Sequence, residues 1–445
     1  MADRMILGEG VVYSTDSNET GLNNNVIVCG GTGCGKTMSI AEPRILETME
    51  SSLVVTVTKR RLVRKYSGLL RKRGYDVQEL NFINPSESDV AYDPLAYIRT
   101  AADVSFFAEA LVMADPRKEK SNADPYWDAA AISLLSAEIA YTTMTKSNAT
   151  FADVLALHRQ LKVINLGGGS EIKTTLDDKF AKLELLHPDC FAVNCWRSFR
   201  QLPTRTANCV FGALNVMLDT VFTDDVCKMI AEKPRIDIAG IGERKTALFI
   251  STSAVNPALH SFINMFYAQM FKLLFEMSEK RSDGVLPVPV HVLCDDFATG
   301  GRVLNFPEYI SIFREKRISV TILLQSESQL RAMYGAENMT TIINNCDTYI
   351  YMGGMDIDTS RAVCERLNRP LEEVLYMPIG QMFIFRRGQY PITTQRYNIL
   401  ENEVYIKLTK AYEESQKKGQ ERLEALRKKP SVLEVAPPPD LKGIA

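Results

Sequence analysis

The sequence has 445 residues, of which 46% are apolar and 24% are charged, and it includes 25 glycines and 19 prolines. This composition is typical of a globular protein and excludes a disordered, collagenous or disulfide-scaffold chain. The length allows two or three domains of about 150 residues, or one large α/β domain with an insertion. The formal net charge of −2 provides no overall basic field, so contact with nucleic acid would need a local patch.

The nine cysteines form no C-x-x-C pair, and none has a histidine at the spacing of a zinc site. We interpret them as reduced core thiols of a cytosolic protein. Residues 1–10 lack the apolar core of a signal peptide. The most apolar stretch, residues 258–277, is interrupted by polar side chains, whereas a membrane-spanning helix needs about 20 largely apolar residues. The sequence therefore predicts a soluble protein.

Strand and helix patterns alternate in the first hundred residues. Residues 25–29 predict a short buried strand, and Lys36 begins a helix that is interrupted near Pro43. Residues 53–57 and 76–82 predict two further strands. This order is typical of βαβ units around a parallel sheet.

The character of the sequence changes after residue 101. Strand-like runs are scarce up to residue 213, and segments such as 128–141 have helical apolar spacing. An apolar helix is expected at 258–280 and a charged amphipathic helix at 403–429. Strand patterns return at residues 246–250, 288–293, 318–324, 348–352 and 381–386.

These patterns predict one α/β nucleotide-binding domain that an all-α domain interrupts. The first part of the α/β domain spans residues 1–100 and its second part spans 214–400. The inserted all-α domain spans 101–213, and a helix with a proline-rich tail occupies 401–445.

One motif carries most of the chemistry. It fits the pattern G-x-x-x-x-G-K-[ST] between a predicted strand and a predicted helix. Glycines let such a loop turn its N–H groups toward phosphate oxygens. Lys36 is expected to bridge the β- and γ-phosphates of ATP, and the Thr37 hydroxyl to bind Mg²⁺. A glycine-rich turn without a ligand is the alternative. The predicted nucleotide-binding residues are Gly30, Gly31, Thr32, Gly33, Cys34, Gly35, Lys36 and Thr37.

Two aspartates end the apolar run that begins at residue 288. Asp295 is expected to hold magnesium, and Asp296 to orient or deprotonate the attacking water. The alternative is a simple turn at a strand end. Lys36 and Asp295 lie far apart in the chain, and the helical insertion accounts for that separation.

Two further polar residues flank the predicted strand at 318–324. Gln325 ends it and could sense the γ-phosphate, while Arg314 precedes it in the helical stretch 306–316. In ring ATPases an arginine in such a place can reach the nucleotide of a neighbouring subunit. A strand cap for Gln325 and a surface salt bridge for Arg314 are the alternatives.

A basic run follows the second strand. It carries cations and no acidic residue, and it continues in residues 71–73. One interpretation is attraction to the phosphate backbone of DNA without sequence preference, and the other is a solvated helix face. The candidate DNA-contacting residues are Lys59, Arg60, Arg61, Arg64 and Lys65.

Together these motifs resemble the type IV coupling proteins, the TraG/TraD-type ATPases that deliver single-stranded DNA and its relaxase into conjugative secretion channels. The resemblance covers residues 25–390. It implies a RecA-like domain with an inserted all-α domain, Mg²⁺ and ATP as cofactors, and a homo-hexamer with catalysis across subunits. By that likeness Arg314 is the trans arginine finger and Gln325 the sensor. The matching segments are Gly30–Thr37, Asp124-Pro-Tyr-Trp-Asp128, Asp295-Asp296-Phe297-Ala298, Phe313-Arg314, Gln325-Ser326 and Asn345-Cys346-Asp347.

The sequence also departs from that family. Asp296 stands where members usually carry glutamate, which predicts slow turnover, and the usual N-terminal membrane anchor is missing. Either the anchor resides on a partner protein, or it belongs to a part of the protein that this sequence does not include. We expect a cytoplasmic protein, monomeric at rest, that a membrane-anchored partner subunit and channel components recruit to the inner face of the membrane. Two other functions fit the same residues: an ATP-binding adaptor with little hydrolysis that recruits protein substrates, and an FtsK/HerA-type DNA pump.

Overall fold

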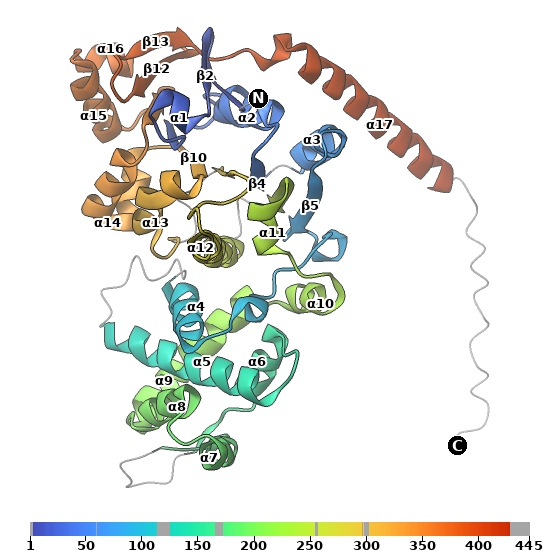
Figure 1. Ribbon diagram of the computed structural model, residues 1–445, viewed down its shortest axis with the longest axis vertical. Helices are drawn as coiled ribbons and strands as arrows, with labels where there is room; N and C mark the ends of the chain where they lie inside the picture. The colour runs from blue at the N-terminus through green and yellow to red at the C-terminus, as the bar shows by residue number, and fades with distance from the viewer. Residues whose placement is uncertain are drawn as a thin grey trace, which may run out of the picture. The chain divides into compact units, whose positions relative to one another are not determined.

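The computed structural model describes residues 3–58, 60–113, 125–164, 172–253, 257–295, 297 and 302–427. The chain divides into two compact units, Met1–Ile399 and Leu400–Ala445. The first unit contains the sheet and the inserted helices, and the second contains a single long helix (Figure 1).

A nine-stranded sheet forms the centre of the first unit, in the order β13-β12-β11-β3-β10-β9-β4-β8-β5. The strands from β11 to β5 run parallel, and β12 and β13 add two antiparallel pairings at one edge. The strand bounds are β3 (Val26–Cys29), β4 (Ser52–Val57), β5 (Asp76–Asn81), β8 (Thr246–Ser251), β9 (Val290–Cys294), β10 (Ile318–Leu324), β11 (Thr348–Tyr351), β12 (Gln381–Arg386) and β13 (Ile392–Gln395).

The apolar runs of the sequence become the inner strands of this sheet. Every residue of β3, β4, β8 and β9 is buried. A parallel strand with helices on both faces is expected to be apolar throughout, because neither face meets water. The predicted RecA-like α/β fold with a mainly parallel sheet is therefore confirmed.

An N-terminal hairpin that the sequence patterns did not predict closes one edge of the sheet. The hairpin consists of β1 (Arg4–Gly8) and β2 (Val11–Ser14), which pair antiparallel. The Glu9 N–H donates to the Gln395 carbonyl at 2.8 Å, and the guanidinium of Arg386 lies 3.5 Å from the centre of the Tyr13 ring. These contacts cover β12 and β13.

Helices surround the sheet and complete the α/β domain. Residues 37–47 form a π-helical turn, Thr37–Ala41, and then α2, so the predicted interruption at Pro43 lies in the first turn of α2. The helix bounds are α1 (Ser17–Thr20), α2 (Glu42–Glu47), α3 (Arg61–Lys72), α11 (Ile238–Glu243), α12 (Pro257–Glu279), α13 (Phe306–Ile312), α14 (Glu327–Asn344), α15 (Ile357–Leu367) and α16 (Leu371–Leu375).

The inserted domain gathers beyond the sheet, below it in Figure 1. Stacked aromatic rings lie in its core, and the rings of Phe180 and Trp196 are 4.2 Å apart. Its only described strands are β6 (Val163–Ile164) and β7 (Lys173–Thr174), which have two residues each and pair antiparallel. Its helices are α4 (Ala101–Met113), α5 (Pro125–Thr145), α6 (Phe151–His158), α7 (Asp177–Leu186), α8 (Phe191–Arg200), α9 (Thr204–Val221) and α10 (Asp224–Glu232).

The predicted end of the insertion at residue 213 falls inside a helix. Helix α9 is continuous across residues 213 and 214, and α10 follows it before β8 resumes the sheet at Thr246. The chain leaves and re-enters the α/β domain along two adjacent segments, where Ala91 and Arg235 form a parallel bridge. The physical boundary therefore lies near residue 235.

A buried aromatic residue joins the two cores. Phe262 of α12 lies 5.1 Å from Phe82, which follows β5, and 5.3 Å from Phe222, which follows α9. The buried apolar residues accordingly form one continuous cluster from the sheet into the insertion. This packing fixes the helical domain against the sheet.

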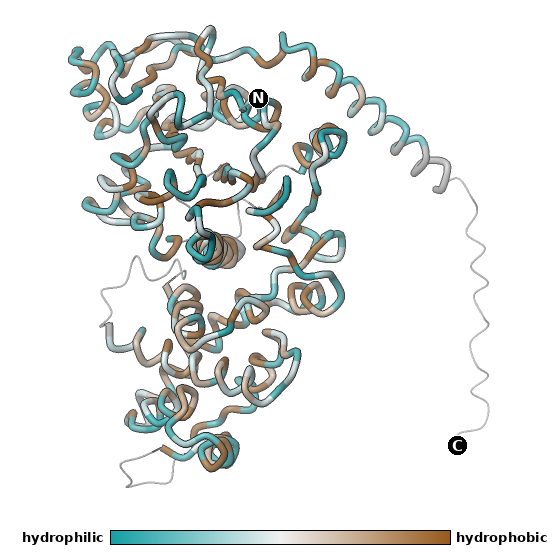
Figure 2. Tube along the Cα trace, in the orientation of Figure 1, coloured by the Kyte–Doolittle hydropathy of each residue, from teal (hydrophilic) through white to brown (hydrophobic). Residues whose placement is uncertain are grey.

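The second unit consists mainly of α17 (Glu403–Arg427). Figure 2 colours most of this helix as hydrophilic. The predicted proline-rich tail lies outside the described residues. Among the described helices, none is long and apolar enough to cross a membrane.

Candidate nucleotide-binding site

The glycine-rich loop follows β3 directly, at the carboxyl edge of the parallel sheet. The Gly30 N–H donates to the Leu324 carbonyl at 3.1 Å, so the loop begins beside the end of β10. Gly33 and Gly35 have φ angles of +82° and +95°. A residue with a Cβ is strained at such angles, whereas glycine is not. Glycine at these two positions therefore allows the loop to curve.

Lys36 lies inside the curve of this loop. Its ammonium donates to the carbonyl oxygens of Gly30 at 2.5 Å and Gly31 at 3.2 Å, and the residue is 9% exposed. A buried ammonium needs acceptors, and here the loop's own carbonyls supply them. The positive charge is thus held within the loop, beside the carbonyls of its first two residues.

Thr37 begins the π-helical turn that continues into α2. Short π-helical segments are rare, and they occur frequently at functional sites. The turn places the start of the helix beside the loop. The first N–H groups of a helix have no intrahelical acceptor, so they are able to bind an anion.

Asp295 reaches the same edge from β9. Strand β10 lies between β9 and β3, with Cys294 paired to Ile322 and Ile322 paired to Ile27. Asp295 is therefore one strand removed from the loop and level with the end of β3. Asp296 lies outside the described residues.

Gln325 follows the last residue of β10, next to the start of the loop. Its side chain is exposed, and its N–H donates to Oε1 of Gln329 at 3.2 Å. Ser326 then caps α14 by accepting from the Gln329 N–H. The structure thus brings Lys36, Thr37, Asp295 and Gln325 to one edge of the sheet.

Arg314 lies at the opposite ends of the parallel strands, where their amino termini are. It belongs to the 3₁₀ turn Phe313–Lys316, which precedes β10, and its side chain is exposed. The seven residues of β10 separate the two edges by about 20 Å. Arg314 is therefore too far from Lys36 to serve the same loop.

Two residues that sequence reasoning missed also contact the loop. The Gly31 N–H donates to the Gly353 carbonyl at 2.8 Å, beyond the end of β11. Arg396, which follows β13, donates from Nη1 to the Cys34 carbonyl at 3.1 Å. Neither residue belongs to a motif, and only the strand order reveals their position.

A buried polar cluster lies behind the loop. Arg366 of α15 donates to Glu327 of α14 at 2.7 Å and lies 4.5 Å from the centre of the Tyr349 ring. Burial raises the pKa of the neighbouring Cys29 thiol to about 12. Cys29 is thus a neutral core residue, and the ion pair joins α14 to α15 beside Gln325.

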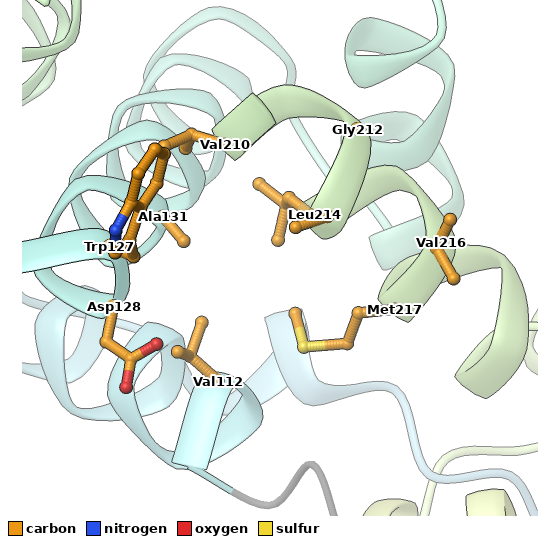
Figure 3. Close-up of a pocket in the computed structure, with 10 residues that line it drawn as sticks. Val112, Trp127, Asp128, Ala131, Val210, Gly212, Leu214, Val216 and Met217 are labelled. Atoms are coloured by element: carbon orange, nitrogen blue, oxygen red, sulfur yellow. The ribbon is translucent and has the colours of Figure 1, made fainter. Parts of the chain in front are cut away.

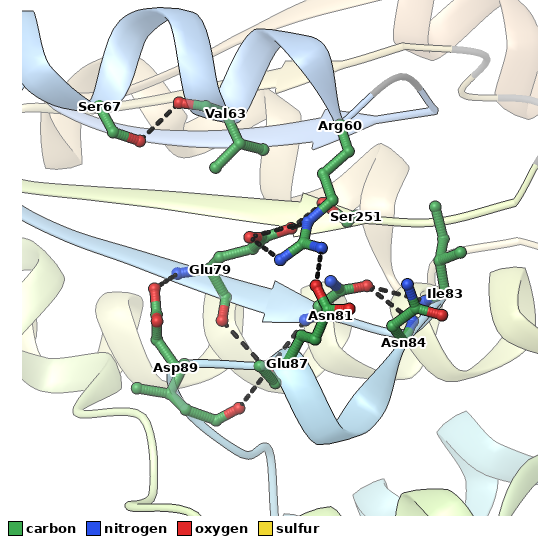
Figure 4. Close-up of polar contacts among 12 residues, drawn as sticks. Arg60, Val63, Ser67, Glu79, Asn81, Ile83, Asn84, Glu87, Asp89 and Ser251 are labelled. Atoms are coloured by element: carbon green, nitrogen blue, oxygen red, sulfur yellow. Dashed lines mark hydrogen bonds and ion pairs between the residues drawn. The ribbon is translucent and has the colours of Figure 1, made fainter. Parts of the chain in front are cut away.

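The basic run contains both paired and exposed cations, and Figure 4 shows how Arg60 reaches Glu79 and Glu87. Arg60 forms ion pairs with Glu79, at 2.9 Å, and with Glu87. Lys65 lies 3.5 Å from buried Glu42. Arg61 and Arg64 are exposed on α3, and Lys59 lies outside the described residues. The DNA-contact prediction therefore rests on the two exposed arginines.

The inserted domain carries an apolar pocket of about 440 Å³. Figure 3 shows Trp127 and Asp128 of α5 on one side and Leu214 and Met217 of α9 on another. Val112 at the end of α4 completes the lining. Trp127 and Asp128 belong to the family-matching segment 124–128, whereas none of the predicted nucleotide-binding, metal-binding, catalytic or DNA-contacting residues lines this pocket.

Known proteins share this fold. The coupling protein TrwBΔN70 in complex with sulphate has a TM-score of 0.66 and 14% identity, over 89% of this chain and 90% of that one. TrwB in complex with ADP and Mg²⁺ has a TM-score of 0.65 and 15% identity, over 89% and 90%. VirB4 of Thermoanaerobacter pseudethanolicus has a TM-score of 0.51 and 12% identity, over 89% and 97%. No curated protein matches the sequence.

A family match covers most of the chain. Residues 3–369 match the family described as "Type IV secretory system Conjugative DNA transfer". This range contains the glycine-rich loop, Asp295, Arg314 and Gln325. The chain therefore belongs to the type IV secretory system conjugative DNA transfer family of P-loop proteins.

Proposed function

We propose that this protein is a coupling ATPase that binds ATP with Mg²⁺ and uses hydrolysis to engage and move DNA, with its relaxase, into a conjugative type IV secretion channel. One observation carries the proposal. The loop lysine, Asp295 and Gln325 come from distant parts of the chain and meet at one edge of one sheet. Ligands of α/β proteins bind at such carboxyl edges.

The residues present fit a magnesium-bound nucleoside triphosphate. The loop is curved by glycines at positive φ, and its buried ammonium lies at the loop carbonyls. A Cβ at Gly30 would lie 2.6 Å from the Cys34 sulfur, so the loop has no room for a side chain there. Hard oxygen donors, from Thr37 and Asp295, are the ligands that magnesium prefers.

Each residue then has a defined part. Bound Mg²⁺ and ATP supply the transferable phosphoryl group and neutralise its developing charge. Lys36 and the loop N–H groups hold the phosphates, while Thr37 and Asp295 hold the metal. Gln325 would sense the γ-phosphate, and we assign to Asp296 the orientation or deprotonation of the attacking water.

Arg314 is proposed to act on a neighbouring subunit. Its distance from its own loop supports a site that is completed in trans, as in a homo-hexameric ring. Arg61 and Arg64 supply an exposed basic surface for DNA. A membrane-anchored partner and the channel components would recruit the protein to the inner face of the membrane.

DNA-stimulated ATP hydrolysis tests this function. The Lys36→Ala protein should hydrolyse ATP at least about a hundredfold more slowly, because the phosphates of ATP lose the cation that the loop holds in place. Lys280→Ala, an exposed lysine at the end of α12, is the matched control and should keep full activity. Circular dichroism and thermal unfolding show whether each variant is folded. Absence of hydrolysis in the wild type, with DNA and with partner proteins, would refute the ATPase.

A further inference from the structure

Strand topology brings one unassigned arginine to the loop. β13 is antiparallel to β12, which is antiparallel to β11, so β13 runs in the direction of β3. Its carboxyl end therefore reaches the edge where the loop lies, and Arg396 is the next residue. The Arg396 N–H donates to the Gly380 carbonyl at 2.8 Å, which anchors its backbone there.

The side chain of Arg396 passes two glycines and approaches one of them closely. A Cβ at Gly380 would lie 3.8 Å from its Nε, and a Cβ at Gly35 would lie 3.0 Å from its Nη1. Both glycines have positive φ, +93° and +95°. The guanidinium thus runs over one glycine and packs against the backbone of the other.

The charge of Arg396 has no acidic partner within the described part of the chain. By contrast, Arg366 is paired with Glu327 and Arg387 with Asp347. Arg396 donates instead to the Cys34 carbonyl of the loop. Its half-buried cation therefore adds positive potential beside Lys36, where an anion is expected.

The contact also fixes a peptide group. The Cys34 carbonyl and the Gly35 N–H belong to the same trans peptide unit, so they point in opposite directions. When the carbonyl points to Arg396, the N–H points away from it. Glycine at this position would otherwise let the peptide rotate at little cost, because glycine tolerates both signs of φ.

We propose that Arg396 is a positioning residue of the nucleotide site. It holds the Cys34 carbonyl, and it thereby keeps the Gly35 N–H directed toward the phosphates. This inference rests on the proposed function, since it presupposes that the loop binds a nucleotide. The Gly35 N–H would serve a phosphate that ADP and ATP share, so both ligands depend on it equally.

Nucleotide binding by the full chain tests the proposal. The probes are the fluorescent methylanthraniloyl derivatives of ADP and ATP with Mg²⁺. Arg396→Met keeps an unbranched apolar stem in place of the arginine and removes its donors, and it should raise both dissociation constants about tenfold. Arg396→Lys keeps a cationic donor and should recover most of that loss. The control is Arg361→Met, at a side chain that is 64% exposed on α15.

The outcomes separate the two proposals. If the wild type binds neither probe, the proposed function fails. If the wild type binds and Arg396→Met binds as tightly, the positioning role is overturned while the proposed function stands. A loss confined to the ATP probe also overturns it, because that result indicates contact with the γ-phosphate. Equal losses in Arg396→Met and Arg396→Lys, with matching drops in the Tm of the nucleotide-free protein, would identify a merely structural residue.

Discussion

At the scale of single residues, the buried histidine of the sheet is paired within it. His291 of β9 is fully buried, and its two ring nitrogens lie 2.8 Å from Oγ of Ser319 and 3.0 Å from Oγ1 of Thr321. Both partners belong to β10. Burial, and then the charge of Arg44, lower the pKa of His291 well below 6.5. The imidazole is therefore neutral in the folded protein.

Stability should consequently depend on pH through His291. Because the pKa of His291 is lowered in the folded state, the contribution of this residue to the free energy of unfolding is complete above pH 6.5. That contribution is lost as the pH falls below that value. The slope is about 1.4 kcal/mol per pH unit until the folded-state pKa is reached. Urea unfolding of the wild type and of His291→Gln between pH 7.5 and about 5 measures it.

The other three histidines are present in both proteins, so the difference between the two curves isolates His291. We expect the wild type to lose stability more steeply than His291→Gln on acidification. Parallel curves would show that His291 takes up a proton in the folded sheet as readily as in the unfolded chain.

At the scale of elements, the helical periodicity of α3 places neighbouring basic residues on different faces. Leu62, Tyr66 and Leu70 recur every four residues and are buried, so one face of α3 packs against the sheet. Arg61 and Arg64 lie away from that face and are exposed. The same basic run therefore contains structural cations and a solvated surface.

Two variants should separate these roles. Arg60→Gln leaves Glu79, a buried carboxylate that also accepts from Ser251 at 2.6 Å, without its cation. We expect the free energy of unfolding to fall by about 1 to 3 kcal/mol. The double variant Arg61→Gln/Arg64→Gln should keep its stability, bind single-stranded DNA more weakly, and lower the salt slope of binding by about 1 per residue.

Titrations of labelled DNA at several salt concentrations, together with thermal unfolding, measure both effects. If the double variant binds DNA with the affinity and salt slope of the wild type, α3 is not the DNA surface. If Arg60→Gln is as stable as the wild type, its ion pair with Glu79 is a solvated contact of little energy.

The same scale shows what the sequence could and could not predict. The inner strands were predictable because burial on both faces demands uninterrupted apolar runs, as in β4 and β8. β13, with the sequence Ile-Thr-Thr-Gln, is only half-buried and lacks such a run. Its position, and with it the role of Arg396, depends on pairing with β12, which is a tertiary property.

At the scale of the whole molecule, the sheet order explains why the site residues are scattered in sequence. The carboxyl ends of parallel strands lie on the same side of the sheet, so the residues that follow β3, β9 and β10 are neighbours. The insertion between β5 and β8 lengthens the chain without disturbing this edge. The opposite ends of the strands carry Arg314, which lies about 20 Å from the glycine-rich loop of its own chain.

Mixing two inactive variants tests whether a second copy supplies that arginine. Lys36→Ala and Arg314→Ala should each hydrolyse ATP at least about a hundredfold more slowly than the wild type. In a randomly mixed ring, about one quarter of the interfaces pair an intact Lys36 with an intact Arg314 from the neighbour. Activity should then recover to about that fraction of the wild-type rate.

A mixture of Lys36→Ala with the double variant Lys36→Ala/Arg314→Ala is the matched control and should stay inactive, because no interface in it has both residues. DNA should be present, so that the subunits assemble, and the mass of the assembly shows that mixed rings have formed. Mixed rings that hydrolyse no faster than either variant alone would mean that Arg314 does not act across the interface. Recovery in the first mixture alone would mean that the edge of the sheet opposite the loop faces the nucleotide of the next subunit.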